Sequence, residues 1–148
     1  MVRKTALVLP MAMLLIAARN VDWTPDWLRH SSPNGYEMTP DGHVWINTQW
    51  TKARVQYGIL ADDLYSAQRA KANEHSFWIR GTYPSNKKGR WENKSLMRIS
   101  CTQRWIAIQD STAYSASGDP AGHAGEGDRR PIVPGSNGEL FYDMLCRS

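Results

Sequence analysis

The sequence predicts an α+β domain, in which a small antiparallel β-sheet carries a C-terminal α-helix that is stapled to it by one disulfide. Three observations lead to this class. Several segments alternate apolar and polar residues, which is the period of a β-strand. One later segment carries helix-capping signals. The two cysteines, Cys101 and Cys146, lie at the ends of the elements that they would join. A chain of 148 residues is expected to form a single domain with a modest core.

An irregular stretch precedes the segments that have a strand pattern. Residues 19–43 are rich in Pro, Ser, Asn and Asp, which predicts an irregular lead-in to a domain over residues 44–148. The segments with strand patterns are 43–50, 53–61, 76–83, 94–101 and 104–115. Residues 62–75 are polar and mixed, which leaves open one or two helical turns or a wide hairpin connection. Residues 116–131 have no hydrophobic face, so a mobile loop is expected there.

The segment 134–146 has the clearest helix signals. Ser136 is a good N-cap residue, and Glu139 follows it three residues later, which is the spacing of a capping box. An apolar stripe follows from two i,i+4 pairs, Leu140 with Met144 and Phe141 with Leu145. A helix of about ten residues is marginal alone. Packing on a sheet and a disulfide at the last turn would therefore stabilise it.

Residues 1–18 have the pattern of a secretory signal peptide. A short basic start, MVRK, precedes the apolar run TALVLPMAMLLIAA, which ends in the small residues Ala17 and Ala18. The run is too short to span a bilayer, and Pro10 interrupts it. Export to the periplasm or cell surface is therefore predicted, without a lipid-attachment cysteine and without stable membrane insertion after cleavage. A buried N-terminal helix and retention as a membrane anchor are the alternatives.

Export would determine whether the two cysteines are oxidised to a disulfide or remain free thiols. In an oxidising compartment two thiols form a disulfide, whereas in the cytosol they stay free. A bond between Cys101 and Cys146 would close a loop of about 45 residues and, in the chain-entropy model, stabilise the fold by roughly 4 kcal/mol. The alternative is a pair of buried, unlinked cysteines. The chain contains no C-x-x-C motif, so a redox role has no support.

Composition and motifs argue against several functions. The net charge of +4 is mild and lies partly in the leader, which argues against a nucleic-acid partner. The histidines are isolated, so we expect no metal site; they are His30, His43, His75 and His123. The adjacent acids Asp62 and Asp63 are expected to form a solvated turn rather than a hydrolytic pair. With no nucleophile motif or phosphate loop, we expect neither catalysis nor a cofactor.

One loop has the composition of a binding surface. In NKKGRWEN, the cations Lys87, Lys88 and Arg90 stand beside Trp91. This predicts a candidate binding surface for a protein or an acidic polymer. The alternative is a solvated hairpin tip whose tryptophan packs back on the sheet. Arg129 and Arg130 would add to the same positive surface if the fold brought them near it, which the sequence does not show.

Three stretches between about Trp45 and Cys146 are distinctive: DLYS before FWIR, SLMRISC running into RWIAIQDSTAYSASG, and RRPIVPGSNGELFYDMLC. In these stretches the chain resembles the surface-adhesin protein E family of exported Gram-negative bacterial proteins. It implies a small antiparallel sheet, a C-terminal helix and a disulfide between them. It also implies a non-enzymatic surface role, because the family is named for binding host extracellular-matrix proteins.

Two classes of function follow. The first is a binding module that uses a sheet face or the basic loop. The second is a structural envelope protein without a dedicated ligand, which could form a homodimer through a strand edge or sheet face. The chain contains seven tryptophans. An exposed aromatic patch would favour the first class, and fully buried tryptophans the second.

Overall fold

The computed structural model describes residues 35–48, 51, 55–83 and 90–147. The expected signal peptide, most of the lead-in, and Lys87 and Lys88 lie outside these residues.

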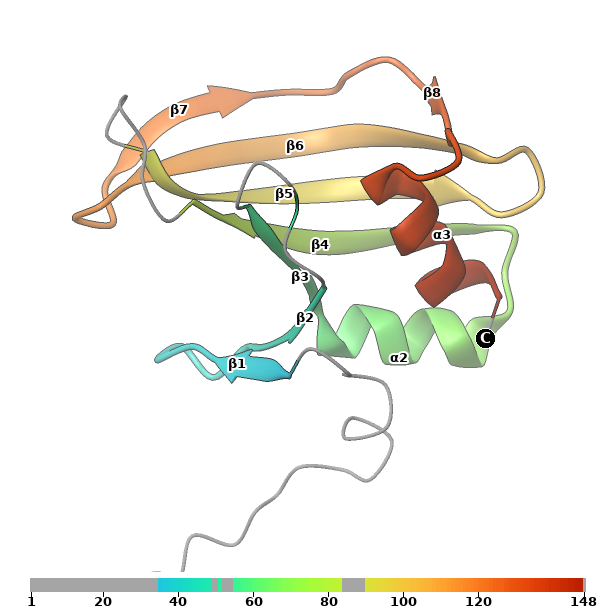
Figure 1. Cartoon of the computed structure of the whole chain (residues 1–148), viewed down its shortest axis with the longest axis horizontal. Coiled ribbons are helices and arrows are strands. Elements are labelled where there is room, and N and C mark those ends of the chain that lie inside the picture. Colours follow the sequence, from blue (N-terminus) through green and yellow to red (C-terminus); the bar gives the residue numbers. More distant parts are fainter. Residues whose placement is uncertain (1–34, 49–50, 52–54, 84–89, 148) are drawn as a thin grey trace, which may run out of the picture.

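The described residues form an antiparallel sheet of eight strands with two helices (Figure 1). The strands are β1 Tyr36–Met38, β2 Val44–Asn47, β3 Gln56–Leu60, β4 Glu74–Thr82, β5 Arg90–Ser100, β6 Trp105–Ser115, β7 Pro120–Ala124 and β8 Arg130–Pro131; the helices are α2 Ala61–Ala70 and α3 Asn137–Cys146. Strands β1 to β7 lie side by side in chain order, and β8 pairs with β6. The expected α+β class is confirmed.

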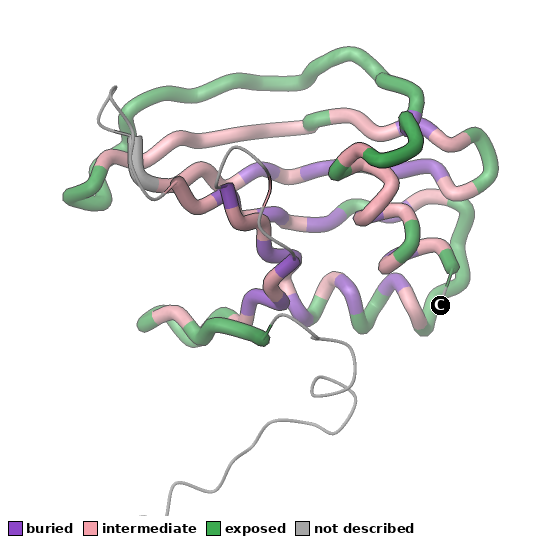
Figure 2. Tube along the Cα trace, in the orientation of Figure 1, coloured by how far each residue is buried: buried purple, intermediate pink, exposed green. Residues whose placement is uncertain are grey.

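Three segments differ from expectation. Residues 61–70 form a full helix, α2, rather than one or two turns. The expected mobile loop at 116–131 instead contains β7 and β8, which pair with β6 through their backbones while their side chains stay exposed (Figure 2). A strand that buries neither face leaves no alternation in the sequence. Tyr36–Met38, inside the expected irregular lead-in, pairs with β2 as strand β1.

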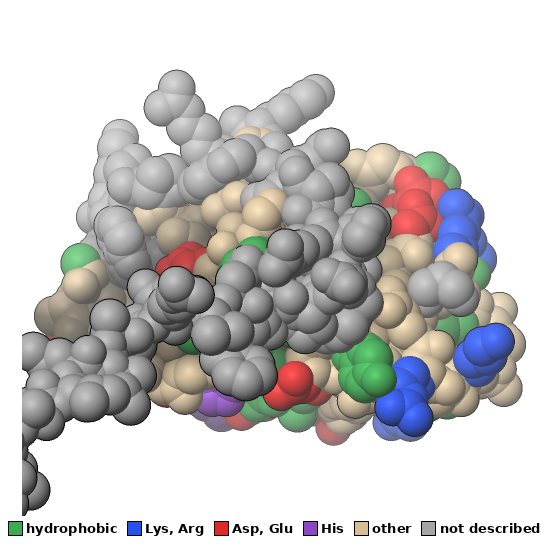
Figure 3. Space-filling view, turned by 90° about the horizontal axis from the view of Figure 1, so that it is seen from below, with side chains coloured by type: hydrophobic (Ala, Val, Ile, Leu, Met, Phe, Trp, Pro, Cys, Tyr) green, Lys and Arg blue, Asp and Glu red, His purple; other side chains and the backbone are tan. Residues whose placement is uncertain are grey.

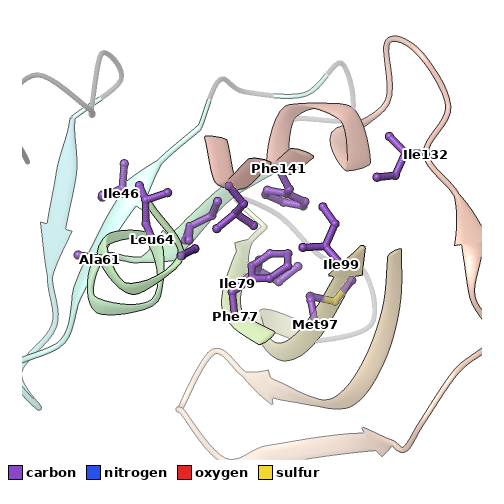
Figure 4. Close-up of a cluster of buried hydrophobic side chains, with 12 residues drawn as sticks. Ile46, Ala61, Leu64, Phe77, Ile79, Met97, Ile99, Ile132 and Phe141 are labelled. Atoms are coloured by element: carbon purple, nitrogen blue, oxygen red, sulfur yellow. The ribbon is translucent and has the colours of Figure 1, made fainter. Parts of the chain in front are cut away.

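The core lies between one face of the sheet and the two helices (Figure 4). We call this the inner face; it carries Ile46, Ile59, Phe77, Ile79, Met97 and Ile99. Phe141 of α3 packs against Phe77 with ring centroids 5.8 Å apart, and Leu64 of α2 closes the same cluster. Because strand side chains alternate, the intervening residues lie on the opposite side of the sheet, which we call the outer face.

Helix α2 runs alongside the part of β4 that β3 does not pair (Figure 1). Strand β3 ends at Leu60, and α2 begins at the next residue. The backbone N–H of Trp78 then donates to the Asp63 carboxylate at 2.6 Å. The first turn of the helix thus supplies the acceptor that a longer β3 would have provided.

Helix α3 begins as the sequence predicts. Ser136 is the N-cap, and its hydroxyl accepts from the Glu139 backbone N–H at 3.3 Å. The Glu139 carboxylate reaches back one residue further than in a standard capping box and accepts from the Gly135 N–H at 2.8 Å. Phe141 and Leu145 are buried on the core side.

Candidate functional site

The disulfide joins the end of the β5–β6 hairpin to the last turn of α3. Cys101 and Cys146 are bonded, with their Cα atoms 5.5 Å apart. Tyr142 strengthens the same junction, because its hydroxyl donates to the Cys101 carbonyl at 3.1 Å. The predicted pairing is confirmed, and it indicates an oxidising, extracytoplasmic environment. Neither of the helices in the described part of the chain is long and apolar enough to cross a membrane.

The predicted basic loop can be placed only in part. Lys87 and Lys88 lie outside the described residues, while Arg90 and Trp91 are the first residues of β5 and their side chains are not described. The loop therefore stays a prediction. Arg129 and Arg130 do not join it: Arg90 pairs with Ser115 at one end of β6, whereas Arg130 pairs with Ile106 at the other. The length of β5, about 33 Å at the usual rise per residue, separates the two groups.

A pocket lies on the outer face of the sheet. It encloses about 320 Å³ and is lined by Asp41, His43, Trp45, Leu60, Trp78, Lys94, Thr112 and Tyr114. We call it the outer-face pocket. Its residues come from five neighbouring strands, β2 to β6, together with the turn that joins β1 to β2. The sheet rather than a loop cluster therefore forms its floor.

Strand register explains why these side chains meet. Trp45 pairs with Leu60 across β2 and β3. On β5, Lys94 pairs with Thr112 of β6, two residues from the pair Glu92–Tyr114. Residues two apart on a strand share a face, so Thr112 and Tyr114 both point to the outer side. The β1–β2 hairpin bends toward this side as well, because Glu37 of β1 reaches Arg80 of β4 at 2.9 Å.

Trp45 lines the pocket, although the residue is almost completely buried. Only 4% of the residue is exposed, and its indole Nε1–H is buried without a hydrogen-bond partner among the described residues. By contrast, the indole of Trp105, which is also buried, donates to Gln103 at 2.9 Å. Most buried polar groups in proteins are hydrogen-bonded, so this donor is an exception; it is enclosed by protein and has almost no surface open to the pocket.

Polar groups stand at two sides of this aromatic wall. In the β1–β2 turn, His43 Nδ1 lies 3.0 Å from the Asp41 carboxylate. Hydrogen bonds from the Thr39 hydroxyl and from His43 hold the pKa of Asp41 well below its usual range, so this carboxyl is ionised at neutral pH. On β5, Lys94 lies 5.6 Å from the Tyr114 ring centroid and 3.6 Å from Glu92.

Arginines gather with aromatic rings near the hairpin that joins β5 to β6. Arg129 and Arg98 lie 4.4 and 6.0 Å from the Trp105 ring centroid. Arg104 and Arg147 flank the Tyr142 ring. Three of these four guanidinium groups also have a carboxylate partner, so the cluster carries little excess charge; the pairs are Arg98–Glu74, Arg104–Glu139 and Arg147–Asp143. Figure 3 shows basic side chains toward the end at which α2 and α3 finish.

Residues considered for catalysis or metal binding have structural contacts instead. Asp63 is half-buried and accepts from Trp78, so the expected solvated turn is wrong for this residue. His75 is buried, and His123 contacts Asp110 at 2.6 Å. In the described part of the chain, no three His, Cys, Asp or Glu side chains gather where they could hold a metal ion.

The outer-face pocket was not predicted from the sequence, although a signal for it exists. Trp45 and Trp78 occupy strand positions that alternate with the core residues Ile46, Phe77 and Ile79. A large aromatic residue on the side of a strand opposite to the core marks a second apolar surface. Which of these residues lie close together depends on register and on the bent β1–β2 hairpin, and neither can be derived from the local pattern.

Comparison with known proteins gives no relative: no family model, no curated protein and no solved structure matches the chain.

Proposed function

We propose that this chain is an exported, non-enzymatic binding domain of the periplasm or cell surface, and that the outer-face pocket is its ligand site. The observation that carries the proposal is the pocket itself, an open hollow of about 320 Å³ in which aromatic side chains stand beside polar ones. Small-molecule sites typically combine apolar walls with a few fixed polar groups. Trp78 and Tyr114 supply the wall, and Thr112 and Lys94 supply polar groups.

Two further features support this proposal. The disulfide and the signal-peptide pattern of residues 1–18 both fit a protein that works outside the cytoplasm. The resemblance to surface-adhesin protein E implies a binding role, with a host extracellular-matrix protein or another envelope component as the partner.

A structural envelope protein without a dedicated ligand is the second candidate. Trp45 and Trp105 are buried and Trp78 is half-buried, so the described tryptophans do not form a broad exposed patch. The edge strand β7 is exposed along its whole length, and an edge of this kind can pair with a second copy of the chain. Sedimentation analysis over a range of protein concentrations tests this pairing, because a dimer formed through β7 would not depend on the outer-face pocket.

A blocked pocket tests the proposed function. Thr112→Trp places a large side chain in the pocket, and Ser76→Trp places the same side chain on an exposed outer-face position of β4 that does not line it. Purified mature protein and both variants would be immobilised and exposed to envelope fractions and matrix proteins. We expect a partner retained by the wild type and by Ser76→Trp to be lost from Thr112→Trp. Equal retention by all three proteins contradicts a ligand site at the pocket.

The export part of the proposal has its own test. Intact-mass measurement of protein recovered from the periplasm or the medium should show cleavage after Ala17 or Ala18. A full-length species confined to the cytosol would contradict it.

A further inference from the structure

We infer that the bond between Cys101 and Cys146 is a site of thiol–disulfide exchange in the folded protein, and that a hollow beside it admits the attacking thiol. The chain is the substrate of this exchange and not its catalyst, so the reaction needs no C-x-x-C motif. The hollow lies on the helix side of the sheet, where α2 and α3 end (Figure 1). The inference is therefore independent of the outer-face pocket.

The disulfide forms part of the wall of this hollow. A volume of about 290 Å³ is lined by Ala67, Gln68, Lys71, Ala72, Asn73, His75, Cys101, Leu145 and Cys146. The segment that connects α2 to β4, residues 71–73, is exposed, so the hollow opens to solvent there. Both cysteines are half-buried rather than buried. A thiol can therefore approach the bond from this side while the domain stays folded.

The charges around the bond favour exchange. The thiolate is the attacking species, and a nearby lysine favours the thiolate over the thiol. Lys71 lines the hollow, and the described lining contains no carboxylate that would repel an incoming thiolate. Glu74, which precedes His75, pairs with Arg98 instead. Exposed disulfides are also the labile ones, whereas buried structural bonds resist reduction.

The exchange needs a thiol as its second reactant. The thiolate of that reactant attacks one sulfur of the Cys101–Cys146 bond and forms a mixed disulfide, and the electron pair of the broken bond leaves with the other sulfur as a thiolate, which takes a proton from water. A second thiol then displaces the mixed disulfide. In total, two thiols of the reactant are oxidised to a disulfide and the protein gains two cysteine thiols. An oxidised dithiol restores the bond by the reverse steps.

Reduction would act first on α3. The helix keeps its non-covalent contacts with the sheet, namely the buried side chains of Phe141 and Leu145 and the hydrogen bond from the Tyr142 hydroxyl to the Cys101 carbonyl. A helix of ten residues is marginal without tertiary support. We therefore expect reduction to loosen the last turn of α3 while the sheet stays folded. The bond is then a redox-sensitive link between the helix and the sheet.

The test separates exchange in the folded protein from exchange after unfolding. Mature oxidised protein would be treated with dithiothreitol at several urea concentrations below the unfolding transition, and alkylation followed by peptide mapping would follow the new thiols. Exchange through the hollow predicts a rate that rises with dithiothreitol concentration but stays nearly constant with urea. A bond that opens only after unfolding predicts a rate that rises with urea in parallel with the unfolding equilibrium.

Matched variants locate the route of the thiol. Ala72→Trp fills the hollow, whereas Ala121→Trp places the same side chain on an exposed position of β7 outside it. We expect Ala72→Trp to slow reduction about tenfold, because exchange depends on access to the sulfur, and Ala121→Trp to react as the wild type does. Lys71→Asn removes the cation but keeps a residue that tolerates the left-handed backbone at this position. It should slow reduction at low salt and have no effect at high salt.

Amide hydrogen exchange of the reduced protein measures the consequence. We expect α3 to lose protection while β4, β5 and β6 keep theirs. A reduction rate that follows unfolding overturns the inference, and so does a wild-type rate in Ala72→Trp. Loss of protection in the sheet together with α3 also contradicts it. A thioredoxin-type dithiol protein, compared with dithiothreitol at equal concentration, identifies the source of the thiol: a faster reaction indicates a protein, and a slower one a small molecule.

Discussion

Asp63 shows how a single residue acquires its role from a distant part of the chain. In sequence it is one of two adjacent acids; in the structure its carboxylate accepts the Trp78 N–H, fifteen residues away. Burial raises the pKa of Asp63 despite this hydrogen bond. The carboxylate therefore links the start of α2 to β4 at the point where β3 ends.

Removing this acceptor should destabilise the fold. Asp63→Ala leaves the half-buried Trp78 N–H without a partner, which typically costs about 1–3 kcal/mol of unfolding free energy. Asp63→Asn keeps an oxygen acceptor and should lose less. Urea denaturation of both variants measures the difference, and Asp62→Ala, which alters the exposed neighbour, is the control. Equal losses in Asp63→Ala and Asp62→Ala would show that the bond contributes nothing.

His75 predicts how stability depends on pH. Burial lowers the pKa of this inner-face histidine, so the folded protein takes up the proton less readily than the unfolded chain. As pH falls below about 6.5, the unfolded state binds more protons, and the contribution of His75 to stability is lost as pH falls through the folded pKa. We expect the unfolding free energy to fall between pH 7 and pH 5, and to fall less in His75→Gln.

The matched control for this prediction is His123→Gln, because His123 is exposed. Denaturant titrations at pH 5, 6 and 7 give the required free energies. A His75→Gln protein with the same pH dependence as the wild type would exclude His75 as the source.

At the scale of elements, a helix or strand could be predicted from the sequence when the residues that specify it lie within one segment. Helix α3 is specified by Ser136, Glu139 and a short apolar stripe, all within one segment, and it was predicted with its N-cap. The central strands were predicted because they bury one face and so alternate. Strands β7 and β8 bury neither, and only their backbones, paired to β6, make them strands. Their side chains therefore give no sequence pattern that predicts a strand.

The disulfide is the strongest single link between elements, and its removal should be costly. Reduction, or the double change Cys101→Ser with Cys146→Ser, should lower the unfolding free energy by roughly 4 kcal/mol in the chain-entropy model. The 45-residue separation sets the size of the effect. Guanidinium denaturation with and without reductant measures it, and non-reducing peptide mapping identifies the bond. In the double serine variant, reductant should have no effect.

At the scale of the whole molecule, the candidate sites lie in separate places on the sheet. The outer-face pocket crosses the middle strands, the predicted basic loop precedes β5, and the arginine and aromatic cluster lies at the opposite end of that strand. The sequence suggested only the basic loop, because clustered charge is visible in one segment. The pocket draws its residues from six segments of the chain, so no single motif predicts it.

Neutralising Lys87, Lys88 and Arg90 together tests the loop. Exposed cations act mainly on encounter and are screened by salt, with a Debye length of about 8 Å at physiological ionic strength. The triple variant should bind an acidic partner more weakly and with a flatter salt dependence, at nearly unchanged melting temperature. Trp91→Ala then separates a contact residue, whose loss weakens binding, from a packed one, whose loss lowers the melting temperature. Unaltered acidic-partner binding in the triple variant would discard the loop.

The meander order of the sheet has a consequence for how the chain acquires its structure. Each strand from β1 to β7 pairs with its neighbour in sequence, so most pairing requires only short loops to close, and such low contact order favours fast folding. The bond between Cys101 and Cys146 is the exception, because its second sulfur belongs to an element that follows the whole sheet. Under the proposed export, the chain would emerge from the membrane amino end first, and the hairpins could pair while Cys101 is still a free thiol. Formation of the disulfide would then be the last step of folding. Until it forms, the free thiols can take part in thiol–disulfide exchange.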